Sequence, residues 1–333
     1  MKKYKSGFVF GKFYGFHMGH KFLADTALQN CEKVTILICS LPSEKIPGDL
    51  RYEWIKEIYK DNPKAIVKWM HRDVPQYPEE HPYFWTIWTK IANEYCPDMD
   101  ILFTSELYGE IYSKYIGVKH QMVDLERKNV PICATNIRND PFSNWEFIPD
   151  VVKPYFTKRI AIMGPESTGK STLTEKLSNY YNTEFVEEYG RVVYERNGNK
   201  VTIDDFIPIS IGRQQLEDEK LKKANKILFC DTEDITTYYL SKEYCGDDYL
   251  QVKDWFEDKI GKSKKYDIYL LLQPDCEWVQ DGTRSFNNIR WEQYDIIKNH
   301  LIKNECYFIE IFGNWDERFS KSINILNGIL FNM

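Results

Sequence analysis

The strongest constraint on the fold is a repeated alternation of short apolar runs with amphipathic segments. In the first half, the apolar runs are GFVFGKF (7–13), VTILICS (34–40), AIVKWM (65–70), DILFTSE (100–106) and HQMVD (120–124). Segments with helical spacing, such as HKFLADTALQNC and RYEWIKEIYKD, lie between them. Buried strands that alternate with helices are typical of parallel sheets. The pattern therefore predicts an α/β fold.

The alternation begins again after an irregular stretch, which indicates two domains. Pro149 and Pro154 disfavour long regular structure in that stretch. The chain of 333 residues is also long for a single core. We therefore predict two domains, each with its own parallel sheet, over residues 1–150 and 158–333. The second set of apolar runs is KRIAIMG (158–164), EFVEEY (184–189), ILFCDT (227–232), DIYLLLQ (267–273) and CYFIEIF (306–312).

Composition and charge exclude several classes of protein. Hydrophobic residues make up 43% and charged residues 28%, as in globular chains. There is neither an apolar run of membrane-spanning length nor a signal peptide. The net charge of −6 argues against nucleic-acid binding. The eight cysteines form no C-x-x-C pair, which favours reduced thiols over zinc binding. We expect a cytoplasmic protein that binds small molecules rather than nucleic acid or membrane, and a homo-oligomer remains open.

The stretch GPESTGKST, residues 164–172, fits the P-loop pattern G-x-x-x-x-G-K-[ST]. It follows an apolar strand and precedes a helical run, which is the context that a P-loop needs. The glycines let backbone N–H groups form an anion nest at the positive end of the helix. Lys170 can reach the β- and γ-phosphates, and the Ser171 hydroxyl can ligate Mg²⁺. The predicted ATP contacts are Gly164, Glu166, Ser167, Thr168, Gly169, Lys170, Ser171 and Thr172.

Further polar residues follow the strands of the second domain. Asp231 ends the run ILFCD and is the expected metal partner of the P-loop serine. Glu187, Glu188 and Arg191 follow the run before it; a carboxylate there can take a proton from an attacking hydroxyl, although a solvated helix start is the alternative. The base is either Glu188 or Asp231. Arg284 in DGTR is predicted to stabilise charge during phosphoryl transfer, with an ordinary surface arginine as the alternative.

A second candidate phosphate site lies at the N-terminus, where HMGH follows the first apolar run. His17 and His20 can both offer an N–H to phosphate oxygens above a helix start. Gly19 between them is expected to let the backbone approach a ligand. The alternatives are a metal site, for which the sequence shows no third ligand nearby, and two buried structural histidines.

These motifs together resemble a known family. H-x-G-H after a first strand is similar to the nucleotidyltransferase superfamily, and CATNIR (133–138) is similar to its second signature. The order of the two domains, together with EEYGR, DTEDITTYYLSKEYCG, WVQDGTR and FGNWDERF, resembles the bifunctional nicotinamide-nucleotide adenylyltransferase and ribosylnicotinamide kinase family. The resemblance covers nearly the whole chain. It implies a Rossmann-like nucleotidyltransferase domain, followed by a P-loop kinase domain, in an enzyme of NAD salvage.

The resemblance implies roles for residues of the first domain, with ATP as co-substrate and Mg²⁺ as cofactor. His17 and His20 would grip the phosphates of ATP while nicotinamide mononucleotide attacks, and Arg138 would hold the leaving pyrophosphate. Lys12 is a further phosphate candidate, though a surface lysine is the alternative. Other residues expected to contact the nucleotide in this domain are Gly11, Phe13, Gly19 and Thr135.

The cationic nicotinamide ring would prefer an electron-rich aromatic face. Trp54, Trp85 and Trp88 are the candidates, with Trp88 preferred, and the alternative is that all three are core residues. Arg51 and Arg191 are further expected substrate contacts.

Three departures from the family pattern qualify the resemblance. The chain begins at the first strand, so the transcriptional repressor activity of members with an N-terminal helix-turn-helix domain is expected to be absent. Gly15 stands where many members have proline, which we expect to be tolerated. Cys133 replaces a usual serine, which leaves backbone N–H groups to bind phosphate there. Two rival functions remain: transfer to another phosphate acceptor, and a nucleotide sensor without turnover.

Overall fold

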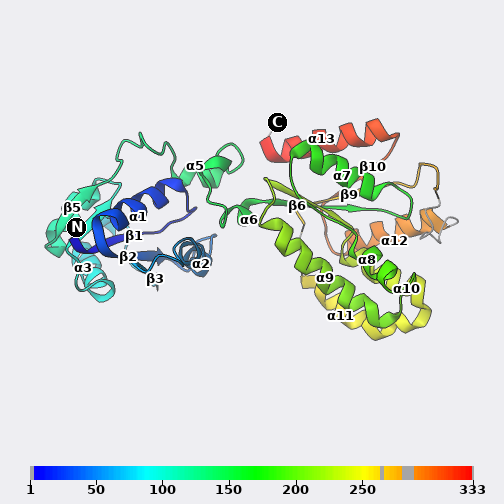
Figure 1. Ribbon diagram of the computed structural model, residues 1–333, viewed down its shortest axis with the longest axis horizontal. Helices are drawn as coiled ribbons and strands as arrows, with labels where there is room; N and C mark the ends of the chain where they lie inside the picture. The colour runs from blue at the N-terminus through cyan, green and yellow to red at the C-terminus, as the bar shows by residue number, and fades with distance from the viewer. Residues whose placement is uncertain (1–3, 263–265, 280–288, 332–333) are drawn as a thin grey trace. The chain divides into compact units, whose positions relative to one another are not determined.

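The computed structural model describes residues 4–262, 266–279 and 289–331, and the chain divides into two compact units, residues 1–153 and 154–333. Each unit contains a five-stranded sheet in which all strand pairs are parallel (Figure 1). The predicted α/β class with two parallel sheets is thereby confirmed. In the part of the chain that is described, no helix has the length and apolar character needed to cross a membrane.

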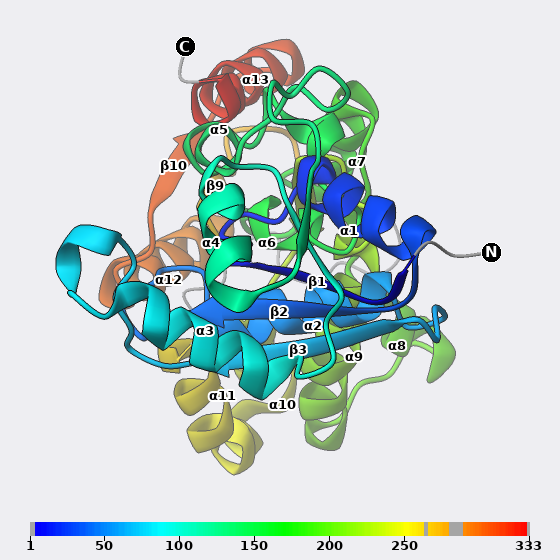
Figure 2. The same cartoon turned by 90° about the vertical axis from the view of Figure 1, so that its left-hand side faces the viewer.

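The sheet of the first unit has the strand order β3-β2-β1-β4-β5. Helices α3 and α4 cover one of its faces (Figure 2), where Phe8, Leu37 and Leu102 of the strands pack against Trp88 and Tyr112 of the helices. The elements of this unit are β1 (Tyr4–Gly11), α1 (Met18–Asn30), β2 (Cys31–Ser40), α2 (Gly48–Ile58), β3 (Ala65–His71), η1 (Pro78–Glu80), α3 (Phe84–Tyr95), β4 (Ile101–Thr104), α4 (Tyr108–Ile116), β5 (Lys119–Met122), α5 (Ala134–Asn139) and η2 (Trp145–Phe147).

The sheet of the second unit has the order β10-β9-β6-β8-β7. Helices α7 and α13 lie on one face, and α9, α10 and α12 lie on the other (Figure 1). The elements of this unit are α6 (Lys153–Phe156, at the junction), β6 (Lys158–Met163), α7 (Lys170–Tyr181), β7 (Phe185–Val186), α8 (Tyr189–Arg196), α9 (Ile203–Leu221), β8 (Ile227–Asp231), α10 (Asp234–Cys245), η3 (Gly246–Tyr249), α11 (Leu250–Lys262), β9 (Ile268–Leu272), α12 (Arg290–Lys303), β10 (Phe308–Ile311) and α13 (Trp315–Phe331).

The strand orders decide where ligands can bind. In each sheet the first strand of the unit, β1 or β6, is paired on both sides, and the chain leaves its carboxyl end directly into a loop and a helix. Ligands of open parallel sheets bind outside the carboxyl ends of the strands, where the strand order reverses. Both sequence motifs, HMGH and GPESTGKS, therefore fall at the expected binding edge of their sheets.

Candidate active sites

The P-loop connects β6 to α7 and has the backbone that an anion nest requires. Gly164, Ser167 and Gly169 all have positive φ angles, of 148°, 57° and 82°. A Cβ atom at Gly164 would lie 2.7 Å from the carbonyl oxygen of Leu272, and one at Gly169 would collide with the ring of Trp315. Both glycines are therefore required by backbone conformation and by space. The loop places its N–H groups at the N-terminus of a twelve-residue helix.

The lysine, serine and aspartate of the predicted kinase site lie together. Parallel pairing of β6 with β8 sets Asp231 opposite Ile162, beside the start of the P-loop. The Asp231 carboxylate is buried, and the Ser171 hydroxyl lies close enough to favour its ionised form. Burial, together with the nearby Glu188 carboxylate, raises the pKa of Asp231 to about 6, against the opposing effects of Lys170 and Ser171. A hydroxyl beside a carboxylate is a donor set that suits a hard divalent cation.

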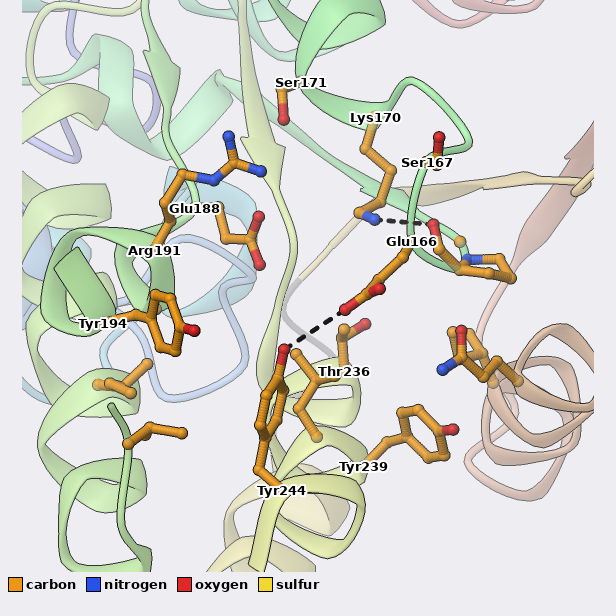
Figure 3. A pocket seen from close by; sticks show the side chains of 18 of the residues that line it. Glu166, Ser167, Lys170, Ser171, Glu188, Arg191, Tyr194, Thr236, Tyr239 and Tyr244 are labelled. Atoms are coloured by element: carbon orange, nitrogen blue, oxygen red, sulfur yellow. Dashed lines mark hydrogen bonds between the residues drawn. The ribbon is translucent and has the colours of Figure 1, made fainter. Parts of the chain in front are cut away.

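A pocket extends from the P-loop between α8 and α10 (Figure 3). Glu188 precedes α8 and lines this pocket with Arg191, whereas the neighbouring Glu187 is exposed. Lys170 donates a hydrogen bond to the carbonyl oxygen of Pro165, at 3.0 Å. Arg284 lies outside the described residues.

The far part of this pocket is aromatic, which the sequence analysis did not predict. Tyr194 on α8 and Tyr239 and Tyr244 on α10 line it (Figure 3). The Tyr244 hydroxyl donates to Glu166 of the P-loop at 3.4 Å. A signal was present in the sequence, because two of these tyrosines lie on the helix that directly follows the strand ending in Asp231.

Two buried arginines that the sequence analysis also missed support the P-loop from behind. Arg318 on α13, 1% exposed, donates to the carbonyl oxygen of Thr168 at 2.8 Å and forms an ion pair with Asp275. Arg290 on α12 donates to the carbonyl oxygen of Ser167 at 3.4 Å. Both guanidinium groups donate hydrogen bonds to carbonyl oxygens on the back of the loop. These bonds hold the carbonyl groups away from the ligand side, so the N–H groups of the loop can face a phosphate.

The two histidines of the first unit form a stacked pair at the start of α1. Their ring centroids lie 3.8 Å apart, and Nδ1 of His17, the N-cap residue, accepts the N–H of Gly19 at 3.0 Å. A Cβ atom at Gly19 would lie 2.9 Å from the His17 ring. The space beside this glycine is thus filled by an imidazole, and the approach of the Gly19 backbone to a ligand stays a prediction. Within the described residues, Nδ1 of His20 is buried and has no hydrogen-bond partner.

The histidine pair is neutral at physiological pH. Burial lowers the pKa of His17 to about 4, with smaller effects from Arg127 and Arg138. Burial also lowers the pKa of His20 well below its ordinary value, with further effects of His17 and the same two arginines. Neutral imidazoles act on a phosphate as N–H donors, so the positive charge of this site resides on its arginines. Arg127 is a cation that the sequence analysis did not single out.

Arg138 lies near the histidine pair on the short helix α5. It donates to the carbonyl oxygen of Tyr14 at 2.7 Å and to the hydroxyl of Thr135 at 3.1 Å. Cys133 is the N-cap of this helix and its side chain makes no capping hydrogen bond. The backbone N–H groups at this helix start are therefore left without a side-chain cap, and their binding of phosphate stays a prediction.

Arg51 lies in the core of the first unit and is not accessible to solvent. Its side chain is fully buried, and its guanidinium donates to the carbonyl oxygens of Lys12 (2.6 Å) and Pro47 (3.3 Å) and to the Glu44 carboxylate (2.6 Å). This corrects the expectation that Arg51 contacts substrate. The Lys12 ammonium pairs with the same Glu44 at 3.3 Å. Phe13, which is buried with φ 47°, packs edge-on against the His20 ring, and Gly11 ends β1 beside it.

The tryptophans differ in exposure. Trp54 and Trp88 are only 4% and 8% exposed, and the Trp88 indole N–H donates to the carbonyl oxygen of Pro75 at 2.9 Å. These positions favour the core alternative for both residues. Trp85 is half-buried and stacks on Tyr115 at 5.2 Å. A role in stacking on nicotinamide stays a prediction, and Trp69, which is 37% exposed at the carboxyl end of β3, joins the candidates.

No group of three His, Cys, Asp or Glu side chains suited to a metal ion occurs among residues 4–262, 266–279 and 289–331. The metal interpretation of His17 and His20 therefore gains no third ligand within these ranges. All eight cysteines carry free thiols.

Comparisons with known proteins agree with this geometry. A protein-family model described as an AAA domain matches residues 159–318. The trifunctional NAD biosynthesis/regulator protein NadR of Escherichia coli K12 is 29% identical over 348 residues, which cover 97% of this chain and 83% of that protein. The NadR protein of Salmonella typhimurium LT2 matches with the same identity and coverage.

Two solved structures share the fold. A crystal structure of a NadR protein in complex with NR has a TM-score of 0.83 at 21% identity, and the match covers 99% of this chain and 97% of that one. A NadR structure in complex with NAD and AMP-PNP has a TM-score of 0.82 at 21% identity, with 99% and 98% covered. The chain is thus similar in sequence to the NadR proteins along nearly its whole length, it shares the fold of the two NadR structures, and its second unit contains a P-loop domain.

Proposed function

We propose that this chain is a bifunctional enzyme of NAD salvage. The second unit phosphorylates ribosylnicotinamide with ATP, and the first unit transfers the adenylyl group of a second ATP to the resulting nicotinamide mononucleotide. The chain is a kinase and a nucleotidyltransferase of NAD biosynthesis, as its NadR homologues indicate. The observation that carries the proposal is that a single NadR-like chain contains both the P-loop with Ser171 and Asp231 and the His17–His20 pair with Arg138.

In the kinase reaction, the 5′-hydroxyl of the riboside attacks the γ-phosphorus of ATP, and the bond from that phosphorus to the β–γ bridging oxygen breaks. Lys170 and the P-loop N–H groups would hold the β- and γ-phosphates. Ser171 and Asp231 would hold Mg²⁺, which neutralises developing charge on the phosphate oxygens. Because Asp231 is assigned to the metal with Ser171, we assign the base to Glu188, which lines the pocket from the start of α8. The riboside would lie in the part of the pocket lined by Tyr194, Tyr239 and Tyr244.

In the adenylyl transfer, a phosphate oxygen of nicotinamide mononucleotide attacks the α-phosphorus of ATP, and pyrophosphate leaves. The attacking phosphate is already an anion at pH 7, so no general base is needed. The site must align two repelling anions and stabilise the charge that develops. His17 and His20 would donate N–H groups to the triphosphate, and Arg138 would hold the leaving pyrophosphate.

The two reactions form a short route from riboside to mononucleotide to NAD. Free thiols at all eight cysteines suit the cytoplasmic location that belongs to this proposal. ATP with Mg²⁺ would serve both units.

The proposal is tested by incubating the purified protein with ATP, Mg²⁺ and ribosylnicotinamide and separating the products by chromatography. We expect mononucleotide to form first and NAD to follow. In parallel, pyrophosphate release is measured with a panel of other phosphate acceptors, and phosphorylation with a panel of other nucleosides. A stronger response to another acceptor in either panel would contradict the assignment for that unit, and ligand binding without any product would support the sensor alternative.

A further inference from the structure

Tyr14 lies in the loop between β1 and α1 and contacts three separate segments of the first unit. Its carbonyl oxygen accepts a hydrogen bond from Arg138 at 2.7 Å, and its hydroxyl accepts the backbone N–H of Lys45 at 3.0 Å. Two guanidinium groups also lie over its ring, with the Cζ atoms of Arg138 and Arg51 at 4.7 and 5.3 Å from the ring centroid. The ring thus links an arginine near the histidine pair to an arginine in the core.

The two arginines differ in what they can still bind. The charge of Arg51 is balanced by Glu44, and its side chain is fully buried. Arg138, by contrast, donates only to neutral oxygens, those of Tyr14 and Thr135, and within the described residues no carboxylate pairs with it. A guanidinium has five N–H donors. Arg138 therefore keeps both its net charge and part of its hydrogen-bonding capacity for an anionic ligand.

The backbone beside Tyr14 is shaped around the stem of the same arginine. Gly15 has φ 90°, a conformation that favours glycine. A Cβ atom at this position would lie 3.3 Å from Cγ of Arg138 and 3.4 Å from the carbonyl oxygen of Ala134. The Tyr14–Gly15 turn therefore encloses Arg138 at its stem, through the glycine, and at its head, through the tyrosine ring and carbonyl.

We propose that Tyr14 is a positioning residue for adenylyl transfer: its ring and carbonyl hold the Arg138 guanidinium beside the histidine pair, where it receives the pyrophosphate part of ATP. Arg51, fixed by Glu44 and by the carbonyl oxygens of Lys12 and Pro47, supports the tyrosine from the core. The inference rests on the proposed function of the first unit. It adds a residue that acts on the leaving group through Arg138 rather than by touching the nucleotide.

The inference predicts a specific effect in the reverse reaction, in which pyrophosphate and NAD are the substrates. Replacing Tyr14 by leucine removes the aromatic face but keeps an apolar side chain. On the usual strength of a cation–π contact, Tyr14→Leu should raise the KM for pyrophosphate about three- to thirtyfold. The KM for NAD should stay within about twofold, because the nicotinamide part of that substrate does not contact Arg138 in the proposed arrangement.

Tyr14→Phe is the matched control, since it keeps the ring and the backbone carbonyl and loses only the hydroxyl that accepts from Lys45. We expect its KM for pyrophosphate to be close to that of the wild type. Equal defects in Tyr14→Phe and Tyr14→Leu would overturn the role of the ring face.

A double-mutant cycle separates positioning from packing. In the Arg138→Ala background, Tyr14→Leu should have no further effect on the KM for pyrophosphate, because the residue it positions is gone. Fully additive effects would overturn the inference. The kinase rate of each preparation, which depends on the other unit, corrects for differences in protein concentration, and thermal unfolding of each variant checks that the first unit is folded.

The same variants distinguish a wrong inference from a wrong function. If the wild type formed no NAD, the proposed function of the first unit would fail. Binding of pyrophosphate to wild type, Tyr14→Leu and Tyr14→Phe, measured by titration calorimetry, would still decide the positioning role. Weaker binding in the leucine variant alone supports it, and equal affinities in all three proteins, or no binding to any, overturn it.

Discussion

The two candidate phosphate sites of this chain differ in the direction in which the fold shifts the pKa values of their side chains. In the first unit, burial and nearby arginines lower the pKa values of His17 and His20, so both imidazoles are neutral donors. In the second unit, burial and neighbouring carboxylates raise the pKa values of Asp231 and Glu233 to about 6 and about 7. The difference fits the roles proposed for the two sites, because neutral imidazoles can donate N–H groups to an anionic phosphate, whereas a carboxylate such as Asp231 suits a bound divalent cation.

The largest expected effect is on the kinase. Lys170→Ala removes the side-chain cation of the P-loop, and riboside phosphorylation should fall by about a hundred- to a thousandfold. NAD formation from supplied mononucleotide should stay near wild type, because that reaction belongs to the other unit. Lys176→Ala on the exposed side of α7 is the control and should leave both rates unchanged. Loss of both activities in a folded Lys170→Ala protein would contradict the division of the reactions between the units.

A somewhat smaller effect is expected in the first unit. His20→Ala removes a donor proposed to contact the triphosphate, and the rate of NAD formation should drop about a hundredfold while phosphorylation of the riboside persists. His17→Ala should act alike, with an added loss of stability because His17 caps α1. Unchanged NAD synthesis in either variant would show that the histidines serve packing alone.

The next effect concerns the turn that encloses Arg138. Gly15→Pro demands φ near −65°, whereas the glycine has φ 90°, so the turn must rearrange. We expect NAD formation to fall about tenfold, on a strain of roughly 1–3 kcal/mol, and Gly15→Ala to have a weaker effect. Gly117→Ala is the control, since Gly117 also has positive φ but ends α4. A fully active Gly15→Pro protein would mean that the loop can hold Arg138 with another backbone conformation at this position.

The sequence was sufficient to predict those features of the two sites that depend on local patterns, namely the strands and the residues that follow them. All ten strands of the described residues form where the apolar runs occur. Ser171 and Asp231 lie at the same edge of the sheet because adjacent parallel strands bring their carboxyl ends together. Residues that act across long separations were not predictable. Arg318 reaches the carbonyl oxygen of Thr168, 150 positions away, and nothing in the local pattern around either residue indicates the pairing.

The sequence also could not show which side chains the fold buries. A buried guanidinium and an exposed one read alike in a sequence, so Arg51 was expected at the substrate and lies in the core. Trp54 and Trp88 show the same ambiguity, since aromatic residues serve both cores and ligand pockets. The sign of a pKa shift also depends on which groups the fold buries together, so the contrast between the two sites emerged only with the structure.

The smallest expected effect tests the opposite pKa shifts of the two units by measuring how the free energy of unfolding depends on pH. Glu233 is buried and caps α10 by accepting the N–H groups of Ile235 and Thr236 at 2.7 and 3.1 Å. Burial and the adjacent Asp234 raise its pKa from 4.5 to about 7. A carboxyl with a raised pKa favours folding below its ordinary pKa, and that stability is lost as the pH rises through the folded value. Glu233→Gln keeps a carbonyl acceptor for the cap but has no proton to lose.

The variant should therefore become more stable than the wild type as the pH rises, and the difference should grow by about 2 kcal/mol between pH 5.5 and 7.5. His17 should act in the opposite direction, because its lowered pKa costs stability as the pH falls below about 6.5. Thermal unfolding of both proteins at the two pH values measures the difference, with Glu187→Gln, an exposed neighbour of the pocket, as the control. A stability difference between Glu233→Gln and wild type that did not change with pH would mean that Glu233 is not held protonated, and the proposed contrast between the two units would then rest on Asp231 alone.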